Sequence, residues 1–349
     1  MMLRDLGYVV GKSYGLKGKL LPYATLEELA GSKNLEELVE KLRPTDYGPY
    51  VSGLPRPLKP TNIELALRRH LVEVHFDLAM KSENAGIIQA YYMKYLASNL
   101  KTILKGKALG KGHEELLEFV DLRAEELVRR RDMVVRAMAA KDLAEAVRSL
   151  SGTKFGDVAG MAMDLYEKEK DLVVFDVAMD KAYFSEVLGE FNKLRFTERK
   201  RIRQMVAADI DGYTVLAIMR SKLWRLTVAE ARRFLLDKAI NIPREIVDMM
   251  LEAENVSDIL YILKETPYKT MLPEPSAQDA ATIRLLEEAF ERLALKKASD
   301  AFLRDIFSVS IPLALIRLKE LEIRNVSIIT AGVDGELGTS RILQRVVKL

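Results

Sequence analysis

Apolar residues recur along the chain with the spacing of one face of a helix. In residues 35–42 they fall at i, i+3, i+4 and i+7, which is the stripe of an amphipathic helix that buries one side. The same stripe returns in residues 143–150 and in residues 256–263. Because helical patterns dominate the rest of the chain as well, we predict an all-α fold with almost no strand.

Each of the three stripes is followed by a threonine, and two residues later by an aromatic residue. The threonines are Thr45, Thr153 and Thr266, and the aromatic residues are Tyr47, Phe155 and Tyr268. A threonine hydroxyl placed after a helix can accept a backbone N–H of the next turn. We therefore predict that the three hydroxyls cap the turns that follow them.

Two further phrases repeat in the same order. One combines an acid, an alanine and a base, and it reads ELALRR at 64–69, DVAMDK at 176–181 and EEAFER at 287–292. The other places a polar residue before an apolar i, i+3 pair, and its polar residues are Asn99, Thr214 and Asn325. Successive copies of the three phrases are offset by 108 and 113, by 112 and 111, and by 115 and 111 residues. This shared period predicts three homologous helical units, 1–112, 113–228 and 229–349, which we call repeats 1, 2 and 3.

Two acidic residues stand inside the apolar helices of the last phrase. Asp211 and Glu322 lie three residues before the polar residue of repeats 2 and 3, so each pair shares one helix face. They could form a partner-binding surface, or a hydrogen-bond network that fixes the register of the helices. We favour the network, and repeat 1 has Leu96 at the corresponding position.

Composition narrows the classes of partner. The chain has 349 residues, 49% of them hydrophobic, and 54 basic against 51 acidic residues, for a net charge of +3. This balance is far from that of a nucleic-acid-binding domain, so we expect no nucleic-acid partner. No apolar run approaches the roughly 18 residues of a spanning helix, and Arg4 and Asp5 interrupt any signal peptide. We therefore expect that any membrane association is peripheral.

The sequence lacks the patterns of catalytic and ligand-binding sites. The stretches 11–19 and 332–340 both fail the spacing of a phosphate-binding loop. His70 and His75 are five residues apart, which turns them about 140° around a helix and away from a common metal. The chain contains no cysteine. We predict no catalytic residue, no cofactor and no metal site, and expect a protein that is not an enzyme.

Four stretches of the chain are typical of one known family, and they are YVVGKSYGLKGKLL at 8–21, YYMKYLASNLKTILKGKALG at 91–110, DIDGYTVLAIMRSK at 209–222 and LIRLKELEIRNVSIITAG at 315–332. In these stretches the chain resembles the C subunit of the archaeal and bacterial A/V-type ATP synthases, the relative of the d subunit of the eukaryotic V-ATPase. The resemblance spans nearly the full length and includes the threefold repeat. The family pattern has an acid before an Asn in the first two repeats, whereas this chain has Leu96 and Thr214 at two of those places.

The resemblance implies a mechanical role. Members of this family are funnel-shaped, pseudo-threefold sockets on the cytoplasmic side of the membrane. They couple the central stalk, which consists of the D and F subunits, to the proteolipid (c/K) ring and transmit torque without chemistry of their own. By this resemblance we expect a peripheral protein that touches the membrane only through the ring, with one copy per complex, and a monomer when isolated. A helical-repeat scaffold for an unrelated protein would show the same periodicity and is the alternative.

Overall fold

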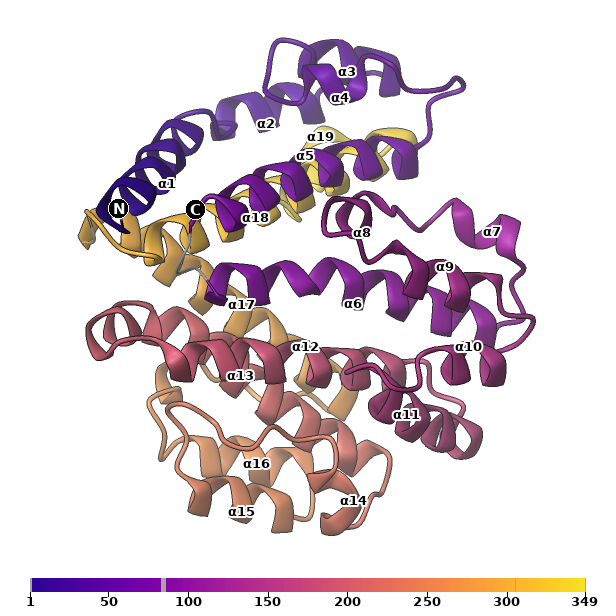
Figure 1. The fold of residues 1–349 in the computed structure, drawn as a ribbon, viewed down its shortest axis with the longest axis vertical. Helices are drawn as coiled ribbons and strands as arrows, with labels where there is room; N and C mark the ends of the chain where they lie inside the picture. Colours follow the sequence, from indigo (N-terminus) through magenta and orange to yellow (C-terminus); the bar gives the residue numbers. More distant parts are fainter. Residues whose placement is uncertain (1, 83–85, 305, 349) are drawn as a thin grey trace. The chain divides into compact units, whose positions relative to one another are not determined.

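The computed structural model describes residues 2–82, 86–304 and 306–348, and every element in these residues is a helix (Figure 1). The prediction of an all-α fold is confirmed for this part of the chain. Repeat 1 contains α1 (Met2–Lys17), α2 (Tyr23–Ala30), α3 (Leu35–Leu42), α4 (Gly48–Val51), α5 (Pro60–Met80) and α6 (Gly86–Ala108). Repeat 2 contains α7 (His113–Leu117), α8 (Arg123–Leu127), α9 (Arg131–Ala139), α10 (Leu143–Ser149), α11 (Gly156–Glu169), α12 (Val173–Lys193) and α13 (Phe196–Leu223). Helix α14 (Val228–Arg232) begins at the last residue of repeat 2 and continues into repeat 3. The other elements of repeat 3 are α15 (Arg244–Glu252), α16 (Val256–Leu263), the 3₁₀ helix η1 (Lys269–Met271), α17 (Asp279–Arg304), α18 (Ser310–Asp334) and α19 (Thr339–Leu343).

One set of five helical elements occurs in the same order in each repeat. A helix is followed by the apolar-striped helix, a turn with the threonine, a further helical segment and two long helices. The sets are α2 to α6, α9 to α13, and α15 to α18 with η1. A short helix comes after each second long helix, namely α7, α14 or α19.

The apolar-striped helices α3, α10 and α16 begin in the same way. Asn34, Asp142 and Asn255 are their N-caps, and each side-chain oxygen accepts the backbone N–H three residues on, at 2.8 to 3.0 Å. Such a cap satisfies one of the backbone donors that the first turn of a helix leaves open. The local signal that starts the striped helix is therefore present three times.

The second long helices α6, α13 and α18 also end in the same way. Just past each end stands a residue with positive φ, and these are Gly110 (75°), Arg225 (49°) and Glu336 (53°). The next residue donates its N–H back over five residues, to the carbonyls of Gly106, Ser221 and Gly332, at 2.8 to 3.0 Å. This is the bond of a Schellman cap, which stops a helix and reverses the chain.

A small residue at this cap allows a close approach of the short helix that follows. A Cβ on Gly332 would lie 2.6 Å from Cγ1 of Ile342 in α19, so only glycine fits there. Repeat 2 has Ser221 in place of the glycine, and the position equivalent to Ile342 is the small, buried Ala231. The two positions thus change size in opposite directions between repeats.

The chain forms two compact units. The first comprises Met1–Tyr95, Leu117–Arg130 and Ala298–Leu349, and the second comprises Leu96–Leu116 and Arg131–Lys297. The two units are defined by which residues contact each other in space, whereas the three repeats are defined by similar stretches of sequence. The repeat boundaries 1–112, 113–228 and 229–349 therefore stay a prediction.

The first compact unit is built around α18. Helices α1, α2, α3, α5 and α19 all pack against it, so its side chains are buried on nearly every side (Figure 1). A helix surrounded in this way needs apolar residues all round rather than a single stripe. The buried Lys319 and Glu322 are exceptions to this pattern, and they pair with each other.

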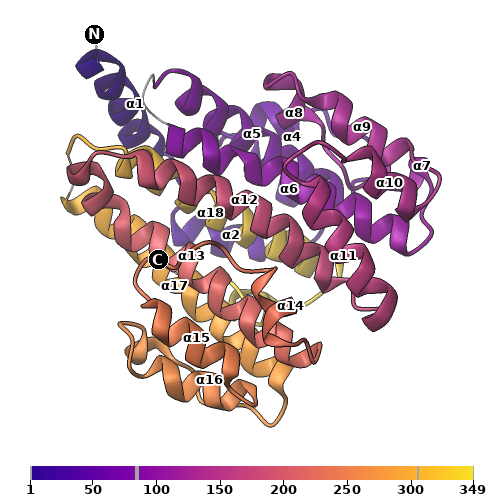
Figure 2. The same cartoon turned by 60° about the horizontal axis from the view of Figure 1, so that its bottom comes forward.

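The second compact unit is built around α13. Helices α12, α14, α15 and α16 pack against it, and α15 lies beside α16 (Figure 2). The C-terminal half of α13 is buried, whereas the first turns of α13 carry the basic run of residues 195–203 on a largely exposed surface. There Arg201 donates to Glu198 at 3.0 Å, within the same helix.

Candidate functional site

The three marker threonines make identical hydrogen bonds. Each hydroxyl donates to the carbonyl three residues before it, at 2.6 to 2.7 Å. Each hydroxyl also accepts the N–H of the aromatic residue two positions on, at 3.2 to 3.3 Å. The predicted capping geometry of Thr45, Thr153 and Thr266 is therefore confirmed. The turn that it fixes directs the following aromatic residue into the core, where Tyr47, Phe155 and Tyr268 are 1 to 3% exposed.

Asp211 binds three donors in the second compact unit. Its carboxylate accepts the hydroxyl of Tyr268 at 2.6 Å and the backbone N–H groups of Ile240 and Asn241 at 2.5 and 2.8 Å. Burial raises the pKa of Asp211, while these hydrogen bonds act in the opposite direction. Asp211 thereby ties α13 to the segment before α15 and to the turn after α16.

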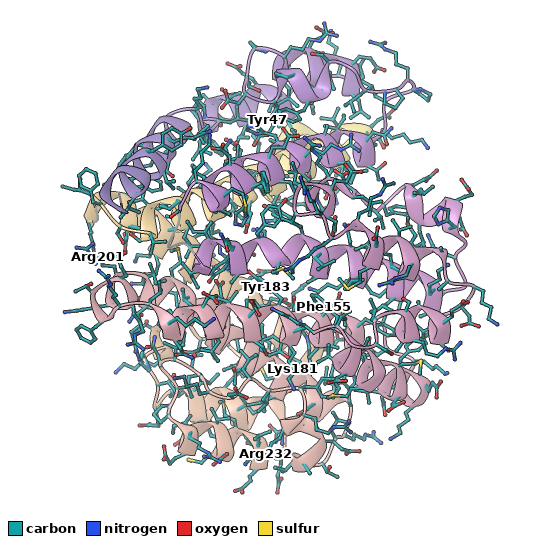
Figure 3. The ribbon with its side chains drawn as sticks, viewed as in Figure 1. Tyr47, Phe155, Lys181, Tyr183, Arg201 and Arg232 are labelled. Carbon is teal, nitrogen blue, oxygen red and sulfur yellow. The ribbon has the colours of Figure 1, made fainter. Side chains whose placement is uncertain are left out.

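Glu322 does the same in the first compact unit. Its carboxylate accepts the hydroxyl of Tyr47 and the backbone N–H of Leu21, the latter just before α2. Burial, and then the nearby Glu322 charge, raise the pKa of Tyr47 well above its usual value, so the phenol stays protonated and donates. Glu322 thus ties α18 to the segment before α2 and to the turn after α3, on which Figure 3 labels Tyr47.

A fully buried lysine, Lys319, completes a cluster with Tyr47 and Glu322. Lys319 is 0% exposed, donates to Glu322 at 3.4 Å, and lies 5.3 Å from the centre of the Tyr47 ring. Its charge is therefore offset by one carboxylate and by one aromatic face. The repeated phrases did not single out Lys319, although its position three residues before Glu322 is the signal that could have found it.

His70 packs against the same cluster from α5. Its ring meets the Tyr47 ring edge-on at 5.0 Å, and its Nδ1 is buried without a hydrogen-bond partner. Burial, and then the charge of Lys319, lower the pKa of His70 to about 4, so the ring is neutral at physiological pH. His75 lies elsewhere on α5, with Nδ1 at 3.1 Å from the Tyr95 hydroxyl and Nε2 at 2.9 Å from the Ile88 carbonyl.

The polar markers of the long helices do not share one role. Asn325 donates to the carbonyl of Val347 at 2.9 Å and accepts its N–H at 3.0 Å, so it holds the C-terminal segment against α18. Thr214 instead donates to the carbonyl of Ile210 within its own helix at 2.9 Å. Asn99 is buried on α6. Asp211 and Glu322, by contrast, are buried and lie in hydrogen-bond networks. Neither carboxylate is exposed to bind a partner.

One open hollow lies in the first compact unit. It has a volume of about 570 Å³ and is lined by Tyr50, Arg69, Glu73, Leu117, Val120, Asp121, Leu122, Arg123 and Glu126. Arg69 pairs with Asp121 at 2.9 Å, and Arg123 pairs with Glu73 at 2.8 Å. Both guanidinium groups are therefore neutralised within the wall. Among the described residues, no cluster of three or more His, Asp or Glu side chains is placed to hold a metal ion.

Comparison with known proteins identifies the family. The model of the family described as ATP synthase (C/AC39) subunit matches residues 9–345. The chain belongs to this ATP synthase family. The C subunit of the A-type ATP synthase of Methanocaldococcus jannaschii is 26% identical over 99% of this chain and 87% of its own length. The corresponding C subunits of Methanosphaera stadtmanae and Pyrococcus abyssi are 23% and 24% identical, over 91% and 96% of this chain and 81% and 88% of their own lengths.

The chain is thus a component of a membrane-associated synthase. Within residues 2–82, 86–304 and 306–348, no helix is both long and apolar enough to cross a membrane. The clusters around Asp211 and Glu322 join helices to backbone segments. The family match thus shows that the chain is a subunit of an ATP synthase, and the buried clusters describe how the helices are held together.

Proposed function

We propose that this chain is the non-catalytic central-stalk rotor component of an A/V-type ATP synthase that translocates protons or sodium ions. In this role it is a socket that receives the D and F subunits of the stalk and couples them to the proteolipid (c/K) ring. The observation that carries the proposal is the family match over residues 9–345, which leaves almost no part of the chain outside it. The proposal places the chain on the cytoplasmic side of the cell membrane, peripherally, in one copy per complex and as a monomer when isolated.

The internal repeat suggests how such a socket is built. Three repeats with the same order of helices and the same caps can close around an axis as three similar wedges. The pseudo-threefold funnel is part of this proposal and follows from the resemblance to the family. A body of this kind transmits torque only if it is stiff, and buried hydrogen-bonded clusters such as that of Glu322 resist shear between helices.

A binding experiment tests the proposal. The purified chain is mixed with a D–F stalk complex and with a detergent-solubilised proteolipid ring, and the assemblies are weighed by native mass spectrometry. We expect one copy of the chain in a ternary assembly, and no association of stalk with ring when the chain is omitted. A chain that binds neither component would overturn the proposal and favour the general helical scaffold.

A further inference from the structure

Two hydrogen bonds join the same pair of positions in different repeats. Asp211 of repeat 2 accepts the hydroxyl of Tyr268 of repeat 3, and Glu322 of repeat 3 accepts that of Tyr47 of repeat 1. In each case the acid lies three residues before the polar marker, and the tyrosine lies two residues after the marker threonine. The bond therefore always passes from one repeat to the next, in the order 2 to 3 and 3 to 1.

The same two positions at the remaining step, from repeat 1 to repeat 2, are Leu96 and Phe155. Neither carries a polar side-chain atom, since a leucine stands where the other two repeats have an acid, and a phenylalanine stands where they have a tyrosine. Both are nevertheless buried, with 5% and 2% of their surface exposed. A change at one position is thus matched by the complementary change at the other.

Helix α6 does meet repeat 2 at this step. Lys105 pairs with Asp176 at 2.8 Å, one turn after Lys101 pairs with Asp180 at 2.6 Å. The equivalent ion pair at the step from repeat 2 to repeat 3 joins Arg220 to Glu287 at 3.0 Å. Because corresponding positions of the long helices pair at both steps, we expect α6 to have the register that sets Leu96 against the turn of repeat 2.

We propose that Leu96 and Phe155 form the apolar counterpart of the acid–tyrosine pair, and that the difference in chemistry specifies which repeats join. Three similar repeats in one chain can in principle pair in a wrong order. Phe155 set against Asp211 would leave a buried carboxylate short of a donor, and a tyrosine set against Leu96 would leave a buried hydroxyl unpaired. Either mismatch is costly, so the mixed set of pairs disfavours wrong orders as well as stabilising the right one.

The contact itself is tested on the unaltered protein. In a sample with labelled leucine methyls and phenylalanine rings, we expect a nuclear Overhauser effect between Leu96 and Phe155. Leu100 lies one turn further along α6 and is also buried. Its methyls serve as the control, because their assignment shows that the effect comes from Leu96 and not from a neighbouring leucine. The absence of a Leu96 to Phe155 effect would overturn the proposal, whatever the stability of any variant.

The chemical match is tested by a double-mutant cycle. We expect Phe155→Tyr to lower the folding equilibrium constant about tenfold, and Leu96→Asp to lower it about a hundredfold. The folding equilibrium constant of the double variant should be about tenfold higher than independent effects would give, because each new polar group finds the other. The total loss should therefore be about a hundredfold rather than about a thousandfold. Leu100→Asp combined with Phe155→Tyr is the matched control and should show no such coupling. Equal coupling in the two cycles would contradict the proposal.

The specificity is tested by refolding. The Leu96→Asp, Phe155→Tyr variant makes all three joints polar and so removes the difference between them. From denaturant, we expect it to give at least about twofold less native monomer than the unaltered chain, with the remainder as swapped or misassembled species on size-exclusion chromatography. An unchanged yield would show that the chemical difference does not direct the order of the repeats.

Discussion

Acidification should destabilise the first compact unit through a histidine that the fold keeps neutral. His75 is 0% exposed, and its Nε2 lies 2.9 Å from the Ile88 carbonyl, which can only accept. The neutral ring therefore donates from Nε2 and accepts from the Tyr95 hydroxyl at Nδ1. A second proton on the ring would reverse the role of that hydroxyl and would bury a charge.

The pKa values give the size of this effect. Burial, and then the charge of Lys94, lower the pKa of His75 to about 3, whereas an unfolded histidine titrates near 6.5. Because the unfolded chain takes up the proton first, the stability is fully present above about pH 6.5 and is lost as the pH falls toward about 3. Each pH unit in this window costs about 1.4 kcal/mol, so the loss at pH 5 is about 2 kcal/mol.

Urea unfolding followed by circular dichroism at about pH 7.5 and at pH 5 measures the loss. The quantity compared is the difference between the free energies of unfolding at the two pH values. We expect His75→Gln, which keeps a donor and an acceptor, to reduce this difference by about 2 kcal/mol. His70, whose pKa is lowered to about 4, contributes in the same direction and remains in both proteins. The matched control is His113→Gln at the exposed third histidine, which should keep the full difference. An identical pH dependence of the unaltered chain and His75→Gln would refute the reasoning.

Three further changes test the caps and the close contacts. Thr266→Ala should lower the free energy of unfolding by about 1 kcal/mol, because a buried N–H loses its acceptor. Thr266→Ser keeps the hydroxyl and should retain most of the stability. An unchanged urea midpoint for Thr266→Ala would contradict this. Gly332→Val should cost about 2 kcal/mol by overpacking against Ile342, and Ile342→Ala should relieve part of that cost in the double variant, as thermal unfolding would show. Asn325→Ala removes both bonds to Val347, so hydrogen exchange of the C-terminal segment should accelerate at least about fivefold; unchanged exchange would count against this anchor.

Much of the fold could be predicted from local patterns in the sequence. The 3.6-residue stripes and the threonine turns depend on neighbours in the chain, and the structure has helices and caps at these places. The N-caps Asn34, Asp142 and Asn255 carry an equally local signal, since each stands directly before its apolar stripe. The left-handed caps at Arg225 and Glu336 could not be found in this way, because neither is a glycine.

The partners of the buried acids could not be predicted from the sequence. Asp211 and Tyr268 are 57 residues apart, and Tyr47 and Glu322 are 275 residues apart, so only the packing of the repeats brings them together. The sequence did indicate that Asp211 and Glu322 form structural networks, since an acid inside an apolar helix needs donors. It gave no sign that the marker tyrosines supply those donors.

The proposed role of the chain as the link between stalk and ring is tested most directly by removing it. Complex purified without this chain is reconstituted into vesicles, and ATP hydrolysis and ion pumping are measured on the same sample, before and after the chain is added back. We predict that hydrolysis persists without the chain, that ion pumping is lost, and that adding the chain restores pumping. Ion pumping that continues without the chain at its normal ratio to hydrolysis would contradict the account.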